Sequence, residues 1–422
     1  MSTPDTLFLQ IHTLTPYAAA LLNRDDVGLA KRMPYGGTTR LRVSSQCLKR
    51  HWREVASQWS LAALVDPVTG REAPGTVRSR KILTREVGLP LVADGYAQDD
   101  VIAVVGALKS RLLGESKKAK AAKADKKAKA SGPEPDAKDT LEAALDTNQV
   151  IVLGRPEIDF IHTTARKLLE QHPNDAAAAV EALLKQKEVA DNLHALRLAA
   201  GLDAALFGRM VTSDILARGD GAVHVAHALT VHAEESEPDY FVAIDDLTRE
   251  AGELGTGLIQ TAELTSGLYY GYVVIDVPQL VSNLEGVEAA AWRGADRRLA
   301  AAVIERLVAL IATTSPGAKL GSTAPYGYAD FVLVEAGTRQ PRSLMAAFYE
   351  AVAQEGARTG AVKALGSYLG AFDRMYGHEE DRRVASLLDV AALPAVAAPD
   401  GLAGLAHWAA GLVADAPARS AP

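Results

Sequence analysis

The chain has 422 residues, 48% of them hydrophobic, and a formal net charge of −7 at pH 7. This length suffices for two domains, or for one elaborated domain, with a buried core. The single cysteine, Cys47, excludes an internal disulfide framework and a cysteine-rich zinc site, and it is typical of a reducing compartment. The sequence has no apolar run near the roughly 18 residues of a membrane span and no N-terminal signal pattern, so we expect a soluble, cytoplasmic protein.

The first predicted element is a strand over Thr6–Leu14, where apolar and polar side chains alternate. Leu9 and Ile11 would face the core. Phe8 and His12 on the other face could stack on nucleic-acid bases, as aromatic side chains do in strand-based RNA-binding domains. The alternative is an edge strand with ordinary packing, because two residues make no platform.

The most informative stretch is Asn23–Arg53, which we call the basic segment. It holds eight basic and two acidic residues, so its charge is +6 and the rest of the chain sums to −13. Charge concentrated in this way predicts a binding surface for an anionic backbone. The basic residues are Arg24, Lys31, Arg32, Arg40, Arg42, Lys49, Arg50 and Arg53, and the acidic residues are Asp25 and Asp26.

A helix is predicted over Gln46–Trp59, directly after two good N-cap residues, Ser44 and Ser45. Their hydroxyls, the free backbone amides of the helix start and Lys49 could converge on one phosphate. The simpler alternative is that the polar face of the helix is merely solvated. The predicted core face is Leu48, Trp52, Val55 and Trp59, and the predicted binding face is Gln46, Lys49, Arg50 and Arg53.

The next part of the chain, residues 61–202, is predicted to hold loops and short helices over Leu61–Leu113 and a helical subdomain over Leu141–Leu202, where the apolar spacing is mostly helical. Within it, Ser116–Pro133 holds seven lysines and one acidic residue among many alanines. This composition indicates a low-complexity surface insertion. A solvated insertion is one interpretation, and a salt-sensitive contact with a DNA duplex is the other.

Three histidines follow at His224, His227 and His232. They have no cysteine nearby and do not form the H-E-x-x-H pattern, so we interpret them as structural or interface residues and not as zinc ligands. Residues 233–265 then show only a long, irregular excursion punctuated by glycines.

The C-terminal half predicts alternating strands and helices, with the clearest strand signal of the chain in a run of aromatic and β-branched residues. The predicted elements are the strand Leu268–Ile275, the helix Glu288–Thr313, the strand Asp330–Glu335 and the helices Ser343–Gln354 and Ala361–Tyr376. Beyond Val390 the chain is rich in Ala, Pro and Gly, which predicts a poorly ordered terminus.

Several ordered motifs resemble CasC, the repeated backbone subunit family of the type I-E CRISPR surveillance complex Cascade, within the wider Cas-seven group. The similarity spans nearly the whole chain. The matching stretches are Asn23–Asp26, Gly36-Gly37, Arg40–Arg50, Gly208–Met210, Thr212-Ser213, Asp220–Ala222, Ala226–Ala228, Asp239–Phe241, Asp245–Leu247, Ser266-Gly267 and Pro316–Lys319.

The resemblance implies an α+β fold with a modified RRM-like (ferredoxin-like) core, a helical insertion subdomain and a thumb-like arm. The core would comprise residues 1–60, 203–232 and 266–390, and the insertion 61–202 would include the lysine-rich stretch 116–133. The arm would be 233–265, and a low-complexity C-terminal tail would occupy 391–422.

The resemblance also implies a non-catalytic RNA-binding subunit, without cofactor or metal, that polymerises along the CRISPR guide RNA. Its partners would be the guide RNA, target DNA through the guide, further copies of itself and subunits of the CasA, CasB, CasD and CasE types. The predicted RNA-binding residues are Asn23, Arg24, Lys31, Arg40, Arg42, Ser44, Ser45, Gln46, Lys49, Arg50, Arg53, Arg209 and Met210. Met210 would wedge its polarizable side chain against a base.

One departure from the family pattern concerns the paired glycines. The family often places a basic residue directly after them, whereas here Thr38 and Thr39 precede Arg40. One phosphate contact is therefore expected to be shifted or lost.

An alternative function is a metal-dependent ribonuclease, like the type III relatives of the same group. The sequence lacks a P-loop, a G-x-S-x-G motif and a cysteine metal pattern. Asp25 and Asp26 are the candidates for holding Mg²⁺ beside a phosphate. The NRDD string is the type I-E form, which binds without cutting, and in that case the two aspartates would position Arg24 and the following loop.

Overall fold

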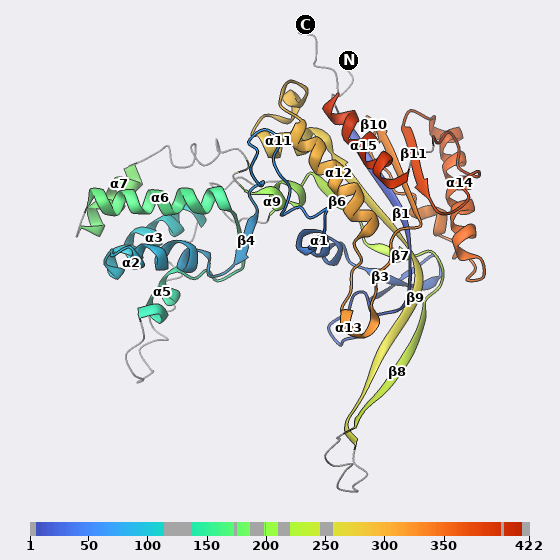
Figure 1. The fold of residues 1–422 in the computed structure, drawn as a ribbon, viewed down its shortest axis with the longest axis horizontal. Coiled ribbons are helices and arrows are strands. Elements are labelled where there is room, and N and C mark those ends of the chain that lie inside the picture. The colour runs from blue at the N-terminus through green and yellow to red at the C-terminus, as the bar shows by residue number, and fades with distance from the viewer. Residues whose placement is uncertain are drawn as a thin grey trace. The chain divides into compact units, whose positions relative to one another are not determined.

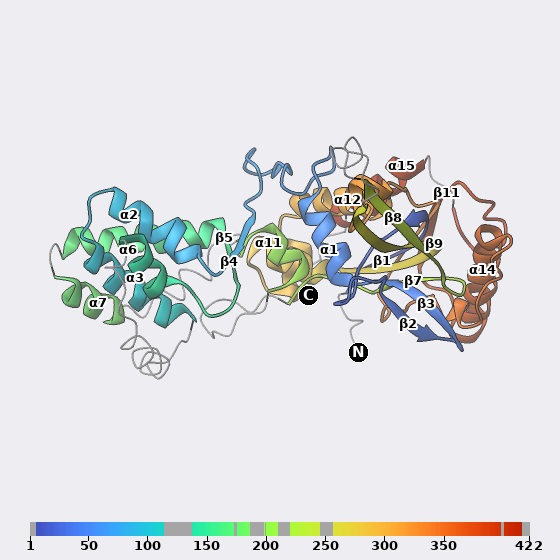
Figure 2. The same cartoon turned by 90° about the horizontal axis from the view of Figure 1, so that it is seen from below.

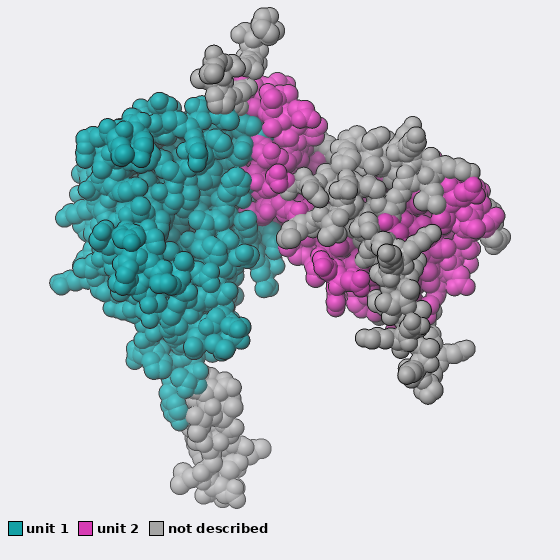
Figure 3. Space-filling view, turned by 180° about the vertical axis from the view of Figure 1, so that it is seen from behind, with its two compact units in different colours: residues 1–68, 223–278, 297–422 teal, residues 69–222, 279–296 magenta. Residues whose placement is uncertain are grey.

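The computed structural model describes residues 6–113, 137–172, 175–185, 198, 200–209, 220–244, 256–397 and 401–415 (Figures 1 and 2). The chain forms two compact units, which Figure 3 colours separately. Unit 1 comprises residues 1–68, 223–278 and 297–422, and unit 2 comprises residues 69–222 and 279–296. In the described ranges, no helix is both long enough and apolar enough to span a membrane. The lysine-rich stretch 116–133 and Met210 lie outside the described residues.

Unit 1 is organised around an antiparallel sheet whose main path runs β11-β10-β1-β9-β7-β3-β2 (Figure 1). Strands β6 and β8 also pair with β9, outside this path. The strands are β1 (Phe8–Ala20), β2 (Arg32–Tyr35), β3 (Thr38–Val43), β6 (Val223–Val225), β7 (Ala228–Thr230), β8 (Glu235–Ile244), β9 (Thr256–Asp276), β10 (Phe331–Gly337) and β11 (Asp381–Ser386). This sheet and its helices place the chain in the predicted α+β class.

Helices cover both faces of this sheet, and Figure 1 shows α12 and α14 on either side of β1. Thr13 of β1 shares a pocket with Trp52 of α1 and Ile311 of α12, so these two helices lie on one face. Leu14, the next residue of β1, packs against α14 on the other face. The helices of the unit are α1 (Ser45–Glu54), α12 (Arg298–Thr313), α13 (Leu320–Thr323), α14 (Ala357–Tyr376) and α15 (Gly401–Ala414), and α11 (Val277–Glu285) begins in it.

Strand β1 is an inner strand, because it pairs with β10 on one side and with β9 on the other. The alternative of an edge strand is therefore wrong. Base stacking by His12 is also wrong, because the His12 side chain is fully buried beneath the α14 face. Its ring stacks on Tyr272, with 5.0 Å between the ring centroids.

A buried network of charges anchors this face of the sheet. Glu335 of β10 accepts hydrogen bonds from Arg342 (2.8 Å), from Arg382 (2.6 Å) and from His12 Nε2 (3.0 Å). His12 Nδ1 in turn lies 2.8 Å from the Tyr270 hydroxyl. Burial alone would raise the pKa of Glu335, but hydrogen bonds from His12 and Arg342 hold that pKa well below its usual range. Burial is the largest influence on His12 and lowers its pKa, which favours the neutral ring.

Two predicted helices are shorter than their patterns suggested. The stretch Ser343–Gln354 contains only a 3-10 turn over Met345–Phe348, and Arg40 donates to the carbonyls of Phe348 and Tyr349. Carbonyls that accept from a distant arginine support an irregular backbone better than a continued helix. The predicted helix Glu288–Thr313 likewise divides into a 3-10 turn over Ala289–Gly294 and α12.

The C-terminal tail is more ordered than its composition suggested. Helix α15 forms within it and packs against α12. Leu405, Ala406 and Ala409 are buried. Alanine and leucine are strong helix formers, and a small-residue face allows close helix packing, so the prediction of a poorly ordered terminus is wrong for residues 401–415.

The arm is a two-stranded ribbon formed by β8 and the first half of β9, and it projects from the sheet (Figure 1). Its base is tied to β2 by Arg32, which pairs with Glu234 at 2.5 Å and with Glu263. Glu263 also accepts from the Ala30 amide at 2.7 Å. Burial would raise the pKa of Glu263, but the Arg32 and Ala30 hydrogen bonds lower it. The role of Arg32 is therefore to hold the base of the arm against β2.

Unit 2 is mainly helical and has its own core, in which Val101, Val104 and Leu108 of α3 are fully buried. A short ribbon of β4 and β5 completes it. The elements are β4 (Thr76–Ser79), α2 (Leu89–Ala93), α3 (Gln98–Leu113), α5 (Ala137–Leu145), β5 (Ile151–Gly154), α6 (Arg155–Gln171), α7 (Ala176–Lys185) and α9 (Leu202–Phe207).

We expect Glu335→Gln to lower the free energy of unfolding by about 3 kcal/mol or more, because it leaves Arg342 and Arg382 without their shared buried carboxylate. Guanidinium denaturation at neutral pH measures this, and Glu350→Gln, at an exposed residue, is the control. A loss below about 1 kcal/mol would contradict the role given to the network.

Wild-type stability should also fall as the pH drops below 6.5, the ordinary pKa of histidine, because unfolded His12 then binds a proton that buried His12 does not.

Candidate nucleic-acid interface

The basic segment folds into a loop, the β2-β3 hairpin and helix α1, and Asn23 holds these parts together. The Asn23 carbonyl accepts from the Lys31 amide at 2.9 Å, and its Oδ1 accepts from the Ser44 amide at 2.9 Å. The Lys31 carbonyl accepts from the Arg42 amide at 2.8 Å. These bonds place Lys31 beside Arg42, although eleven positions separate them in the sequence.

Helix α1 begins where the sequence predicts. Ser44 is the N-cap, and its hydroxyl accepts from the Cys47 amide at 3.3 Å. Trp52 is buried, which confirms the assignment of that residue to the core face, and the helix ends at Glu54, earlier than Trp59. Ser44 is a buried residue whose hydroxyl serves the cap, so we leave it out of the proposed phosphate contacts.

Lys31, Arg42 and His227 form a cationic cluster. Arg42 Nη1 lies 3.4 Å from His227 Nδ1. The pKa of His227 is lowered, first by partial desolvation of its ring against the protein and then by the charges of Arg42 and Lys31. Within the described ranges no carboxylate forms an ion pair with Lys31 or Arg42, nor with Arg24 or Arg53. Positive charge without internal compensation is what an anionic ligand requires.

Arg40 has a different role from the predicted one. Its side chain is fully buried, and Nη1 and Nη2 donate to the carbonyls of Thr230 (3.0 Å) and Phe348 (2.9 Å). Arg40 therefore cannot reach RNA and instead locks the hairpin to the sheet. The turn before it needs glycine, because Gly36 has a φ of +60° and a Cβ there would lie 1.5 Å from the Tyr349 carbonyl oxygen.

Arg209, in unit 2, is also buried, contrary to the prediction. It forms a two-pronged ion pair with Glu157, at 2.5 and 2.6 Å, and donates to the Val152 carbonyl at 3.3 Å. A guanidinium held in this way is a structural cross-link. Nothing in the local sequence around Arg209 identifies its partner on α6.

The two aspartates of the NRDD string differ in surroundings. Asp25 Oδ1 accepts from the amides of Val27 (3.0 Å) and Leu29 (2.9 Å), and so Asp25 shapes its own loop. Within the described residues Asp25 thus orders the following loop as expected, but it forms no hydrogen bond or ion pair with the Arg24 side chain. Asp26 is exposed.

A family model described as CT1975-like protein matches residues 9–403 of this sequence. The chain belongs to the CT1975-like family. Its structure is similar to one described as "CRISPR RNA-guided surveillance complex, pre-nicking", with a TM-score of 0.71, 24% identity and coverage of 96% of this chain and 100% of that one. A second, "CRISPR RNA-guided surveillance complex", has a TM-score of 0.61, 20% identity and coverage of 96% and 99%. These similarities show a shared fold. No curated protein matches the chain.

In this CT1975-like chain the motif Pro316–Lys319 lies against the basic segment. The Ala318 amide donates to the Leu21 carbonyl at 2.9 Å, and the Gly317 amide donates to His51 Nε2 at 3.3 Å. Sequence reasoning left this loop outside the site. The one feature of the sequence that could have assigned this loop to the site was that Pro316–Lys319 is among the ordered motifs.

The three histidines near residue 230 also differ in their surroundings. His232 is buried and structural, since its Nε2 accepts from the Leu268 amide at 3.0 Å and its Nδ1 donates to the Ala233 carbonyl at 2.7 Å. His224 and His227 are exposed. Among the residues described, no group of three or more His, Cys, Asp or Glu side chains is arranged to hold a metal.

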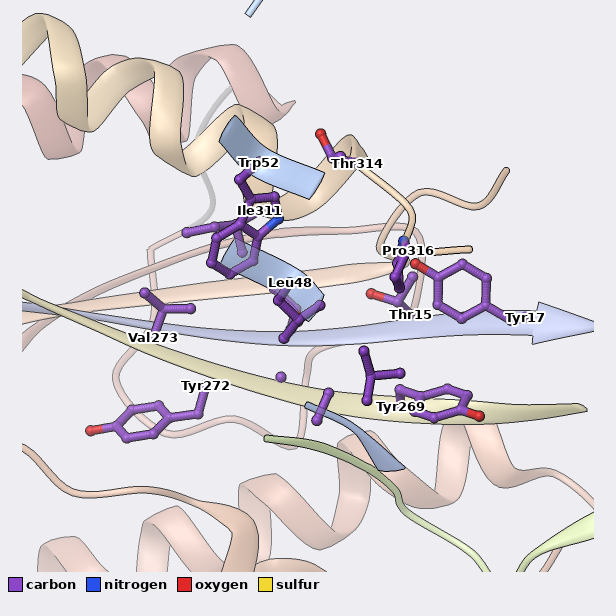
Figure 4. Close-up of a pocket in the computed structure, with 14 residues that line it drawn as sticks. Thr15, Tyr17, Leu48, Trp52, Tyr269, Tyr272, Val273, Ile311, Thr314 and Pro316 are labelled. Carbon is purple, nitrogen blue, oxygen red and sulfur yellow. The ribbon is translucent and has the colours of Figure 1, made fainter. Parts of the chain in front are cut away.

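A pocket lies beneath α1, between that helix, α12, β1 and β9 (Figure 4). Trp52 and Leu48 reach it from α1, and Tyr269 and Val273 from β9. Its lining is apolar with a few hydroxyl groups and includes no charged side chain, so it is not suited to a phosphate.

We expect Lys31→Glu and Arg42→Glu each to weaken RNA binding about tenfold or more, because each removes a charged contact worth about 1.5 kcal/mol. The slope of log affinity against log salt should fall by about one per lost contact. Fluorescence anisotropy with a labelled single-stranded RNA measures both quantities.

Two variants complete this experiment. Lys363→Glu changes an exposed lysine of α14 and should leave binding and slope unaltered. Arg40→Gln should lower the melting temperature, because it leaves buried carbonyls without their donor. Unchanged affinity and slope in both charge-reversal variants would remove the cationic cluster from the interface.

Proposed function

We propose that this chain is a non-catalytic, RNA-binding backbone subunit of the CasC type, which polymerises along the guide RNA of a type I-E CRISPR surveillance complex. The observation that carries the proposal is membership of the CT1975-like family over residues 9–403, together with a fold shared over 96% of the chain with part of a CRISPR RNA-guided surveillance complex. The guide would then pair with target DNA, and subunits of the CasA, CasB, CasD and CasE types would complete the assembly.

We assign unit 1 an RRM-like core. The path β10-β1-β9-β7, with α1 between β1 and β7 and α12 between β9 and β10, supports this assignment. It is the arrangement of a split β-α-β fold. One face of such a sheet often binds RNA through aromatic side chains, but here α14 covers that face. The guide would therefore lie elsewhere, along the basic segment.

The contacts proposed for the RNA backbone come from cations that the fold leaves available. Arg24, Lys31, Arg42 and Arg53 have no carboxylate partner among the described residues, and Arg50 has only the exposed Glu54 pair at 2.9 Å. Exposed pairs of this kind contribute little and exchange readily for phosphate. The remaining predicted contacts retained in the proposal are Asn23, Ser45, Gln46, Lys49 and Met210.

Contacts of this kind recognise the RNA backbone and its shape. Sequence specificity would belong to base pairing between guide and target, as in other guided effectors. The β8-β9 arm would reach the next copy along the RNA. Copies that follow one another in this way need a heterologous interface, because a symmetric one would close after two subunits.

The alternative of a ribonuclease is weaker on physical grounds. Asp25 already uses Oδ1 to accept two backbone amides of its own loop. A carboxylate committed in this way is a poorer ligand for Mg²⁺, because binding the metal would release both amides.

The proposal predicts that the chain, expressed with a CRISPR array and the other subunits of its complex, copurifies with RNA of one regular length. Sequencing of the bound RNA should return guide sequences, and nuclease digestion should reveal a repeating protected interval. Arg42→Glu should reduce the RNA recovered per protein. Recovery of random cellular RNA, without guide enrichment, would refute a guide-binding role.

Catalysis is tested separately with the assembled complex, complementary RNA or DNA, and Mg²⁺ or Mn²⁺. We expect both strands to remain intact, and Asp26→Asn to behave as the wild type. Regularly spaced products that vanish in Asp26→Asn would identify the subunit as a nuclease.

A further inference from the structure

The cationic cluster brings together three segments that are distant in the sequence. Arg42 of β3 is opposite Leu229 of β7, and Val43 is opposite Ala228. His227 directly precedes β7, so the pairing of β3 with β7 sets it beside Arg42. Lys31 joins them through its backbone bond to Arg42. The pairing of β3 with β7 thus sets Arg42 beside His227, and a backbone hydrogen bond sets Lys31 beside Arg42.

Arg42 is only partly satisfied in this cluster. Its Nε is buried and has no hydrogen-bond partner among the described residues. Its Nη1 has His227 Nδ1 as an acceptor, at 3.4 Å. A buried donor without an acceptor is uncommon in proteins, and an ordered water or a bound ion is one way to satisfy it. A phosphate, with several acceptor oxygens, would satisfy such a guanidinium.

The Arg42–His227 contact also depends on protonation. Neutral His227 accepts from Arg42 Nη1 through its Nδ1, whereas a protonated imidazole has two donors and no acceptor. Protonation would therefore place two cations side by side, with Lys31 as a third. Only an anion between them would make that state favourable.

We propose that His227 is the proton-linked third member of a phosphate site formed with Lys31 and Arg42, so that protonation of its imidazole tightens RNA binding. This inference rests on the proposed RNA-binding function and adds a regulation of the same surface. The ligand is a backbone phosphodiester, which needs no base-specific contact.

The charges around the site determine the direction of the effect. Arg42 on β3 and Lys31 before β2 face His227, and burial and these two cations keep its pKa low in the free protein. Burial raises the pKa of the Cys47 thiol on α1, and the nearby positive charges of Arg50 and Lys31 oppose this shift. A bound phosphate offsets this positive charge and raises the pKa of His227. Binding then takes up a proton, so the affinity must increase as the pH falls.

The test compares RNA affinity of the full chain at several pH values from about 8 to about 5.5, the range in which histidine titrates. For the wild type we expect up to about tenfold tighter binding per unit of pH decrease, between the pKa values of free and bound His227. His227→Gln should lose most of the pH dependence, so its affinity at the low end of the range should fall below that of the wild type. His227→Lys, charged throughout, should bind at high pH as tightly as the wild type does at low pH.

His224→Gln is the matched control, because His224 is also exposed and lies three positions earlier. It should keep the wild-type pH dependence. A His227→Gln protein with the full pH dependence, or a wild type that binds RNA equally at every pH, would overturn the inference and leave RNA binding intact. Failure of the wild type to bind RNA at any pH would overturn both. Circular dichroism of each variant checks that it is folded.

Discussion

The structure of unit 1 depends on one long strand. β9 pairs with β1, β6 and β7 over its second half, where it lies inside the core sheet, and with β8 over its first half, where it forms the arm. Because one continuous strand serves both parts, the register of the core sheet also sets the direction in which the arm leaves it. Arg32 then ties the base of the ribbon to β2 through Glu234 and Glu263, so the arm is held at its root from two sides.

The same register assembles the cationic cluster. β7 pairs with β9 and β3 pairs with β7, so Arg42 stands opposite Leu229. A slip of one residue would exchange the face of Arg42 with that of its neighbour Leu41, which is buried. A charged residue would then enter the core, and an apolar one would face solvent. The buried neighbours of Arg42 on β3 therefore protect the position of this half-buried cation.

The basic residues of the chain fall into two groups. Some are buried and hold the structure together, and others keep a charge that a ligand can use. Arg40 and Arg209 are fully enclosed and donate to carbonyls or to Glu157, because a guanidinium has five donors that must be satisfied once water is removed. Arg24, Lys31 and Arg42 keep their charge without a carboxylate partner among the described residues. Since α14 covers one face of the sheet and α1 and α12 the other, these side chains around the hairpin offer the charged surface that the sheet itself lacks.

The sequence by itself determined the features that depend on near neighbours. Near neighbours in the sequence predict the Ser44 cap, the burial of Trp52 on α1, the strand over Leu268–Ile275 and the concentration of charge in the basic segment. The predicted core face does not continue to Val55 and Trp59, because α1 ends at Glu54. Only the tertiary structure decided the features that join distant residues. Arg209 pairs with Glu157, which lies 52 positions away in the sequence, and His12 is hydrogen-bonded to Glu335, 323 positions away. Arg40 donates to the Phe348 carbonyl, 308 positions away. Periodicity describes which face of an element is apolar, but it contains no information about which distant group will supply the hydrogen bonds that a buried charge needs.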